Sequence, residues 1–302
     1  MKVVASTYSS KELAKDLLFL PLQILFELTF RMMLLTNVVS KDAPWHFKKL
    51  IEKKNDRDYI THQLNEFKLG LSLRLKFINY RTKYRSTTLL TKEPETIHWI
   101  RSFGSNREML DIGANIGIYS VFFSAYHESK CYAFEPSLDN CSLLLSNIEA
   151  NNLNKYICVL PIALSKTDCI GELRMPNRDV GHSFLNYNES VGDFKKSNDA
   201  LIFRTLSFTL DTLYDLGIIG SKETIIKLDV DGTELSILIG AQKLLKSGLV
   251  YSILIENSQE PISQKNLDDF LYSCDFRKLE SISEMTLESK PCLLTNSIWL
   301  RV

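Results

Sequence analysis

The sequence predicts an α/β fold in which helices cover both faces of a mostly parallel sheet. Strand-length apolar runs alternate with helix-length segments through most of the chain, which is the pattern of such a sheet. One apolar run ends in Asp111, and a turn containing Gly113 and Gly117 then opens a helix. The next apolar run ends at Glu135, 22 residues beyond Gly113. Because ligands of these sheets bind beyond the carboxyl ends of the strands, we expect the site there.

The composition is typical of a folded globular chain. Of 302 residues, 45% are apolar and 24% are charged, and 36 Lys and Arg balance 36 Asp and Glu. Basic residues are concentrated between Lys48 and Lys92, which fits anionic lipid, a phosphorylated carrier, nucleic acid or a solvated basic face. Nucleic-acid readout is disfavoured, because the rest of the chain is acidic and aromatic residues are not interleaved with the basic ones. The six cysteines lack the spacing of a zinc or redox motif, so reduced thiols in a cytoplasmic protein are expected.

Residues 1–92 are predicted to form an accessory region. Residues 17–39 are strongly apolar, but Glu27 and Arg31 interrupt them, so a spanning helix, which needs about 20 apolar residues, is not expected. Three arrangements of this apolar helix stay open: it lies on a membrane, it packs against a partner subunit, or it packs on the chain's own core. Leu69–Phe77 alternate apolar and polar residues, which predicts a strand with one basic face.

Residues 93–302 are predicted to form the main domain. Its first residues, Glu93-Pro94-Glu95, favour a helix start, because proline suits the first helical turn and acids suit its positive end. That helix is expected to end near Phe103. Further strands are predicted at residues 108–112, 130–134, 157–162, 224–228 and 250–255, and further helices from residue 116, at 138–151 and at 235–246.

The turn after Asp111 favours S-adenosyl-L-methionine as the cofactor. Glycine lets the backbone approach a ligand closely, and the amino terminus of the following helix suits a carboxylate. Glu135 lies at the distance where an acid commonly binds ribose hydroxyls. A dinucleotide fingerprint would instead have glycine at Asn115, so a nicotinamide-dependent oxidoreductase is the weaker alternative. A purely structural glycine turn is another.

Further motifs follow in a fixed order, and they comprise Leu110–Tyr119, Ala133–Pro136, Ala163–Ser165, Thr209–Asp211, Ile226–Gly232 and Gly240–Ala241. Over residues 108–256 the chain resembles the FkbM-type methyltransferase family. The resemblance implies a class I methyltransferase fold, with a Rossmann-like seven-stranded sheet, that uses S-adenosyl-L-methionine. The expected cofactor-binding residues are Asp111, Gly113, Ala114, Asn115, Gly117, Glu135, Pro136, Ala163, Leu164 and Asp229.

A hydroxyl acceptor must lose a proton on methylation, so a base is expected near the strand ends. Asp229 follows the strand at 224–228 and is the leading candidate. A structural role at the cofactor edge or in the Gly232 turn is its alternative. Lys227 precedes Asp229 by two residues and therefore points to the same side of the strand. It is expected either to pair with Asp229 or to contact an anionic substrate.

Three further residues are catalytic candidates with open alternatives. Asp231 stands where the family has Glu, and it either touches substrate or caps the next helix. Glu256 ends a strand, where it acts as a base or holds neighbouring loops. His182 lies in the Gly181–Ser183 loop, which resembles a Gly-x-Ser segment of the family, and it is either catalytic or an inert exposed histidine. A hard cation at Asp229 and Asp231 would need a third oxygen ligand, and no metal is expected.

These features predict an O-methyltransferase that acts on a hydroxyl group of a sugar or glycan, a glycolipid or a polyketide-like small molecule. The family resemblance implies this acceptor class. The apolar segment at 17–39 and the basic strand fit an acceptor carried on a lipid phosphate. They also predict peripheral membrane contact, or a homo-oligomer formed through the amino-terminal helix. A non-catalytic membrane or oligomer scaffold is the remaining alternative.

Overall fold

The computed structural model describes residues 58–65, 67–68, 70–175, 180–181, 186–187, 201–230, 232–257, 261–279 and 296–302. They belong to one compact unit, which begins at Asp58 and ends at Val302. The structure thus places the start of this unit before the domain border predicted at residue 93. The apolar segment at 17–39 lies outside the described residues. Among the described helices, none is both long and apolar enough to cross a membrane.

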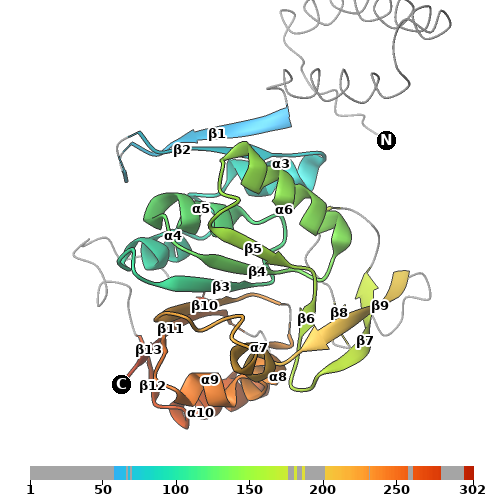
Figure 1. Ribbon diagram of the computed structural model, residues 1–302, viewed down its shortest axis with the longest axis vertical. Coiled ribbons are helices and arrows are strands. Elements are labelled where there is room, and N and C mark those ends of the chain that lie inside the picture. Colours follow the sequence, from blue (N-terminus) through green and yellow to red (C-terminus); the bar gives the residue numbers. More distant parts are fainter. Residues whose placement is uncertain are drawn as a thin grey trace, which may run out of the picture. The chain divides into compact units, whose positions relative to one another are not determined.

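In the described part of the chain, a seven-stranded sheet forms the centre of this unit (Figure 1). In spatial order its strands are β12 (Phe276–Lys278), β13 (Asn296–Arg301), β11 (Val250–Glu256), β10 (Thr224–Leu228), β3 (Glu108–Ile112), β4 (Cys131–Phe134) and β5 (Ile157–Leu160). The strands from β11 to β5 run parallel, whereas β13 runs antiparallel to both of its neighbours. The predicted mostly parallel seven-stranded sheet is therefore confirmed.

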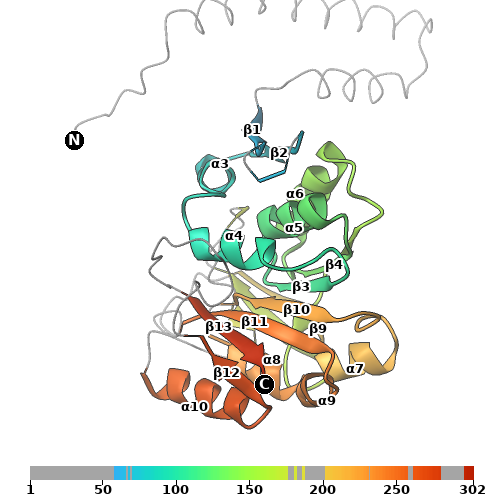
Figure 2. The same ribbon diagram turned by 90° about the vertical axis from the view of Figure 1, so that its left-hand side faces the viewer.

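Helices cover both faces of the sheet, as predicted (Figures 1 and 2). One face carries α4 (Pro94–Arg101), α5 (Ile118–His127) and α6 (Leu138–Ala150), and the other carries α7 (Leu210–Asp215), α8 (Glu234–Ile239), α9 (Gln242–Lys246) and α10 (Pro261–Tyr272). Side chains alternate between the two cores along β10, because Ile225 packs with the first helix group whereas Ile226 and Leu228 pack with the second. Lys227 therefore faces the side covered by α4, α5 and α6.

The segment from Asp58 to Lys92 packs on that same face. It forms a hairpin of β1 (Tyr59–Gln63) and β2 (Ser72–Lys76), followed by α3 (Tyr80–Thr87). Asn147 of α6 and Asn151, which directly follows this helix, bind the free backbone edge of β2. Asn147 Oδ1 accepts from the Lys76 amide at 2.6 Å, and Asn151 exchanges two hydrogen bonds with the Arg74 backbone at 2.8 and 2.7 Å. The predicted strand at 69–77 is thus found as β2, and it belongs to the main unit.

A four-stranded sheet in the described residues was not predicted. It comprises β6 (Ala163–Leu164), β9 (Leu201–Phe208), β7 (Cys169–Met175) and β8 (Asn186–Tyr187) in that order. The strand predicted at 157–162 is found as the shorter β5, which ends at Leu160, and β6 begins at Ala163 in the four-stranded sheet. Pro161 separates the two strands, because proline has no amide hydrogen for a strand ladder.

The single helix predicted at 235–246 is interrupted between α8 and α9. Gly240 packs against the Ser165 carbonyl so closely that a Cβ atom would overlap this oxygen. Asp211 then caps the start of α9, since its carboxylate accepts from the amides of Lys243 at 2.9 Å and Leu244 at 2.8 Å. The motif residues Gly240 and Asp211 therefore have structural roles.

Replacing Gly240 by alanine is expected to lower the free energy of unfolding by about 1–3 kcal/mol, because the new methyl group forces the Ser165 backbone to move. Urea unfolding followed by circular dichroism measures the change. Gly104→Ala is the matched control, since nothing lies within 4 Å of a Cβ atom at Gly104. Equal stability of the two variants would contradict the packing role of Gly240.

Candidate functional site

The turn between β3 and α5 holds three residues with left-handed backbone angles. The φ angles of Gly113, Asn115 and Gly117 are 79°, 52° and 75°. A Cβ atom on Gly113 would overlap the Asp229 carbonyl oxygen, and one on Gly117 would overlap the side chain of Leu144. Both glycines are thus required by positive φ and by contacts within the protein. The expectation that this backbone closely approaches a ligand stays a prediction.

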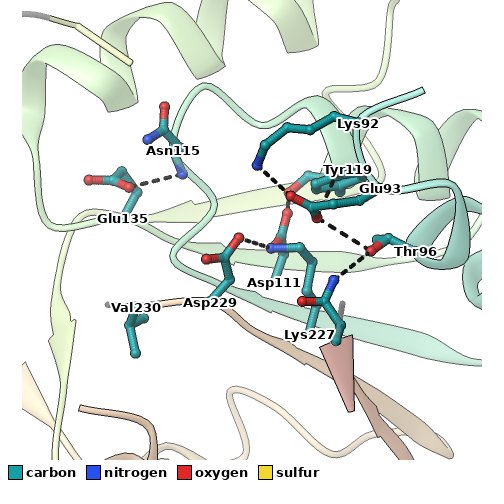
Figure 3. Close-up of polar contacts among 12 residues, drawn as sticks. Lys92, Glu93, Thr96, Asp111, Asn115, Tyr119, Glu135, Lys227, Asp229 and Val230 are labelled. Atoms are coloured by element: carbon teal, nitrogen blue, oxygen red, sulfur yellow. Dashed lines mark hydrogen bonds and ion pairs between the residues drawn. The ribbon is translucent and has the colours of Figure 1, made fainter. Parts of the chain in front are cut away.

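Glu135 follows β4 and faces this turn (Figure 3). Its carboxylate accepts hydrogen bonds from the amides of Asn115 at 2.9 Å and Ser137 at 2.8 Å. Burial raises the pKa of Glu135 to about 7, although both amides favour the ionised form. The structure therefore places a carboxylate that titrates near neutral pH beside the glycine turn.

A set of residues that sequence reasoning missed holds the backbone near Glu135. Asn140 Oδ1 accepts from the Gly181 amide at 2.8 Å, and Arg85 Nε donates to the Gly181 carbonyl at 2.9 Å. Asn79 Nδ2 donates to the Val180 carbonyl at 2.9 Å. Both polar groups of the Gly181 backbone are thus bound by side chains of different helices. No sequence pattern pointed to Arg85 or Asn79, because this contact joins segments about a hundred residues apart.

Lys227 lies at the carboxyl end of β10 between two acids (Figure 3). Its Nζ atom is 2.9 Å from Asp229 Oδ2 and 3.8 Å from Asp111 Oδ1, and its side chain is only 2% exposed. The strand register sets Lys227 directly beside Asp111. Ser120 on α5 donates a hydrogen bond of 2.5 Å to Asp111 Oδ2. The predicted pairing of Lys227 with Asp229 is found, and Asp111 is added to it.

The charges of this cluster are mutually stabilised. Burial opposes ionisation of Lys227, but the carboxylates of Asp229, Asp111 and Glu93 outweigh it and raise the pKa of Lys227. Burial also opposes ionisation of Asp229, yet the Lys227 ammonium lowers the Asp229 pKa to about 2. For Asp111 burial prevails, so its pKa is raised. Lys227 therefore remains a cation and Asp229 an anion at neutral pH.

Glu93 continues the cluster toward α4 (Figure 3). Its carboxylate accepts from the Tyr119 hydroxyl at 3.0 Å and forms an ion pair with Lys92. The Tyr119 ring lies under Lys227, with Nζ 5.0 Å from the ring centre. Thr96 also donates to Glu93, at 3.4 Å. The sequence indicated only a helix start at this position, because nothing local reveals which distant charge a carboxylate will approach.

The loop after β10 and the end of β11 complete the site. Glu256 ends β11 with an exposed side chain, and it lies close enough to Asp229 to influence the pKa of that residue. The carboxylate of Glu234 holds the loop through the amides of Val230 at 3.4 Å and Gly232 at 3.1 Å. The structure thus brings Asp229 and Glu256 together and adds Glu234, which the sequence analysis did not select.

The remaining predicted site residues stay predictions. Ala163 and Leu164 are buried in β6, and Pro136 is half-buried directly after Glu135. Asp231 and His182 lie outside the described residues. Within the described residues, no group of three His, Cys, Asp or Glu side chains is arranged to hold a metal ion.

Replacing Lys227 by methionine is expected to lower the free energy of unfolding at pH 7 by about 3–5 kcal/mol, because it leaves buried carboxylates unpaired. The loss should be smaller near pH 4, where Asp111, with its raised pKa, takes up a proton. Urea unfolding at both pH values measures the difference. Lys222→Met, at an exposed position, is the matched control. A loss no larger than that of the control would disprove the charge balance.

Weak similarities connect the fold to solved structures. TYW2 of M. jannaschii in complex with AdoMet has a TM-score of 0.35 and 11% identity, covering 81% of this chain and 87% of its own. Precorrin-6y C5,15-methyltransferase of Geobacter metallireducens has a TM-score of 0.40 and 12% identity, and the match covers 71% of this chain and 90% of its own. An O-methyltransferase of Bacillus cereus in complex with SAH has a TM-score of 0.38 and 13% identity, and the match covers 72% of this chain and 87% of its own. These similarities are too weak to indicate an acceptor.

Sequence comparison is more decisive. Among curated proteins, none is significantly similar to the chain. The profile of the methyltransferase FkbM domain, however, matches residues 111–278, which is more than half of the chain. This range holds Asp111 and the turn that follows it, together with Glu135, Lys227 and Asp229. The protein therefore belongs to the FkbM methyltransferase domain family and is an S-adenosyl-L-methionine-dependent methyltransferase.

Proposed function

We propose that the protein is an O-methyltransferase that methylates a hydroxyl group of a sugar or glycan, a glycolipid or a polyketide-like small molecule. The observation that carries the proposal is the Asp229 carboxylate, whose side chain is 31% exposed and is held from behind by Lys227. A fixed, partly exposed carboxylate at the carboxyl end of the sheet suits a hydroxyl that must be oriented and deprotonated. The family resemblance supports the acceptor class.

Several observed features fit the cofactor. S-adenosyl-L-methionine supplies a methyl group on a sulfonium, and it carries an ammonium, a carboxylate and a ribose. The acidic side chains of Asp111, Asp229 and Glu135 match its positive groups and its ribose hydroxyls. The Oδ1 atom of Asp111 is buried and accepts no hydrogen bond within the described residues, so it has capacity for another partner. We infer that Glu135 binds the ribose and that the acids near Asp111 favour the cationic end.

Asp229 is proposed to accept the acceptor's proton during methyl transfer. When the new carbon–oxygen bond forms and the carbon–sulfur electrons go to sulfur, the acceptor oxygen becomes positively charged and its proton becomes strongly acidic. A carboxylate with a pKa of about 2 is a weak base toward a free alcohol but is adequate for this proton. Lys227 keeps Asp229 ionised and oriented, so the same contact prepares the carboxylate and limits its basicity.

Methyl-labelled cofactor tests the acceptor class. Purified protein is incubated with an extract of its source cells and S-adenosyl-L-methionine carrying a labelled methyl group, and products are identified by mass spectrometry. The proposal expects label in base-stable methyl ethers of glycans, lipids or small molecules. Label confined to nitrogen, sulfur or carboxyl groups would overturn O-methylation of a hydroxyl while leaving methyl transfer intact.

Asp229→Asn is expected to reduce turnover by about 100-fold or more, because the amide still accepts from Lys227 but does not take up a proton. Cofactor affinity should fall by much less than turnover, because Asp111 and Glu135 keep their charges. Label transfer to the identified acceptor gives turnover, and calorimetry gives affinity. Glu256→Gln is the matched comparison, since Glu256 is the neighbouring candidate base. If that variant lost turnover and Asp229→Asn kept it, the role of base would pass to Glu256.

Cofactor affinity is expected to fall as pH decreases through 7. Because the pKa of Glu135 is raised to about 7, its ionised form, which accepts hydrogen bonds from ribose, prevails only above that pH. The affinity should be about tenfold weaker at pH 6 than at pH 8. Calorimetric titration measures this dependence. In Glu135→Gln binding should be weaker and nearly independent of pH, and an unchanged pH dependence there would rule out Glu135 as its source.

A further inference from the structure

The exposed side of α3 carries aromatic and apolar residues between basic ones. Tyr80 is 83% exposed, Tyr84 49% and Ile78, just before the helix, 57%. Arg81 and Lys83 are exposed on the same helix. At about 100° per residue, Tyr80 and Tyr84 lie side by side with Lys83 and Arg81 flanking them. We call these five residues the α3 surface, and they correct the expectation that aromatic and basic residues are not interleaved.

The α3 surface lies in a strongly basic stretch. Residues 67–92 contain seven Lys or Arg and not one Asp or Glu. The Lys83 ammonium lies 5.2 Å from the centre of the Phe77 ring, which keeps this charge beside apolar surface. A surface that combines exposed tyrosines with positive charge is typical of proteins that lie at an anionic membrane interface.

The helix presents these residues from a fixed base. Its opposite side is buried through Thr82 and Ser86. Asn79 caps the helix, with its side chain accepting from the Thr82 amide at 2.8 Å. His62 on β1 contacts the Ser86 carbonyl at 2.6 Å. Exposure of Tyr80 and Tyr84 is therefore a property of a docked helix, not of a frayed end.

The α3 surface lies beside the cofactor side of the domain. Through Asn79 and Arg85 the helix holds the backbone of Val180 and Gly181, and Arg85 is close enough to Glu135 to lower its pKa. A membrane that contacts α3 would therefore lie near the carboxyl ends of β3 and β4, where the proposed chemistry takes place.

We propose that the α3 surface docks the protein on a lipid bilayer with anionic headgroups. Tyr80, Tyr84 and Ile78 enter the headgroup region, and Arg81 and Lys83 pair with lipid phosphates. A flat bilayer touches only this face. A nucleic acid long enough to extend past the basic stretch would meet the remainder of the chain, which carries the compensating negative charge. The proposal is independent of which hydroxyl compound is methylated.

Vesicle flotation of the full-length protein tests the proposal. Vesicles of phosphatidylcholine alone are compared with vesicles that also contain phosphatidylglycerol. Hydrophobic binding to the membrane by any other part of the chain contributes equally to both kinds of vesicle. The intact protein should prefer the anionic vesicles. Arg81→Gln combined with Lys83→Gln should reduce this preference by about 30-fold, since each basic residue near such a surface contributes about fivefold. Tyr80→Ser combined with Tyr84→Ser should weaken binding to both vesicles.

Lys222→Gln combined with Lys246→Gln is the matched control. It removes the same charge from exposed positions just before β10 and β11, at the opposite ends of the strands. It should retain the anionic preference, and all variants should keep the melting temperature and the cofactor affinity of the intact protein. The proposal is overturned if the control loses as much anionic preference as the Arg81 and Lys83 double variant, or if both α3 variants bind vesicles like the intact protein. Binding to RNA is measured in parallel. A loss of RNA binding without a loss of vesicle binding in the Arg81 and Lys83 variant would also overturn it.

Discussion

The ammonium group of Lys227 lies between Asp111 and Asp229 in a space closed to water, and the arrangement of the sheet end follows from that contact. Three acids approach one buried cation, because Glu93 also influences Lys227 through space. Without the cation, like charges at the ends of β3 and β10 would repel one another in a medium that screens them poorly. Lys227 thus allows acids to gather at the carboxyl end of the sheet, where we propose that the positively charged cofactor binds.

Close backbone contact is the second constraint on this site. The turn after β3 lies so near the loop after β10 that only glycine fits at position 113, and α6 lies so near the turn that only glycine fits at 117. The same compactness brings the Asn115 amide to Glu135. The glycines therefore let three chain segments converge and fix the Glu135 carboxylate, which we propose binds the ribose of the cofactor.

The segment from Asp58 to Lys92 was predicted as part of an accessory region, but it belongs to the main unit. Asn147 and Asn151, at the end of α6, bind the edge of β2 as another strand would, and Arg85 of α3 binds the backbone at Gly181. Its buried leucines join the core under α5. This segment consequently packs beside the candidate site, and its outward face carries charges and tyrosines that do not pack in the core.

The sequence by itself determined the sheet, the glycine turn and the acids at the strand ends, because strand periodicity and short motifs are local properties. β3 and β10 have their predicted bounds, and Asp111, Glu135, Lys227 and Asp229 were selected before any contact was known. Only the tertiary structure decided that Glu93 and Tyr119 approach Lys227, that Arg85 reaches Gly181, and that α3 belongs to the main unit. Those contacts join residues far apart in the chain, and their strength depends on burial, which no local pattern records.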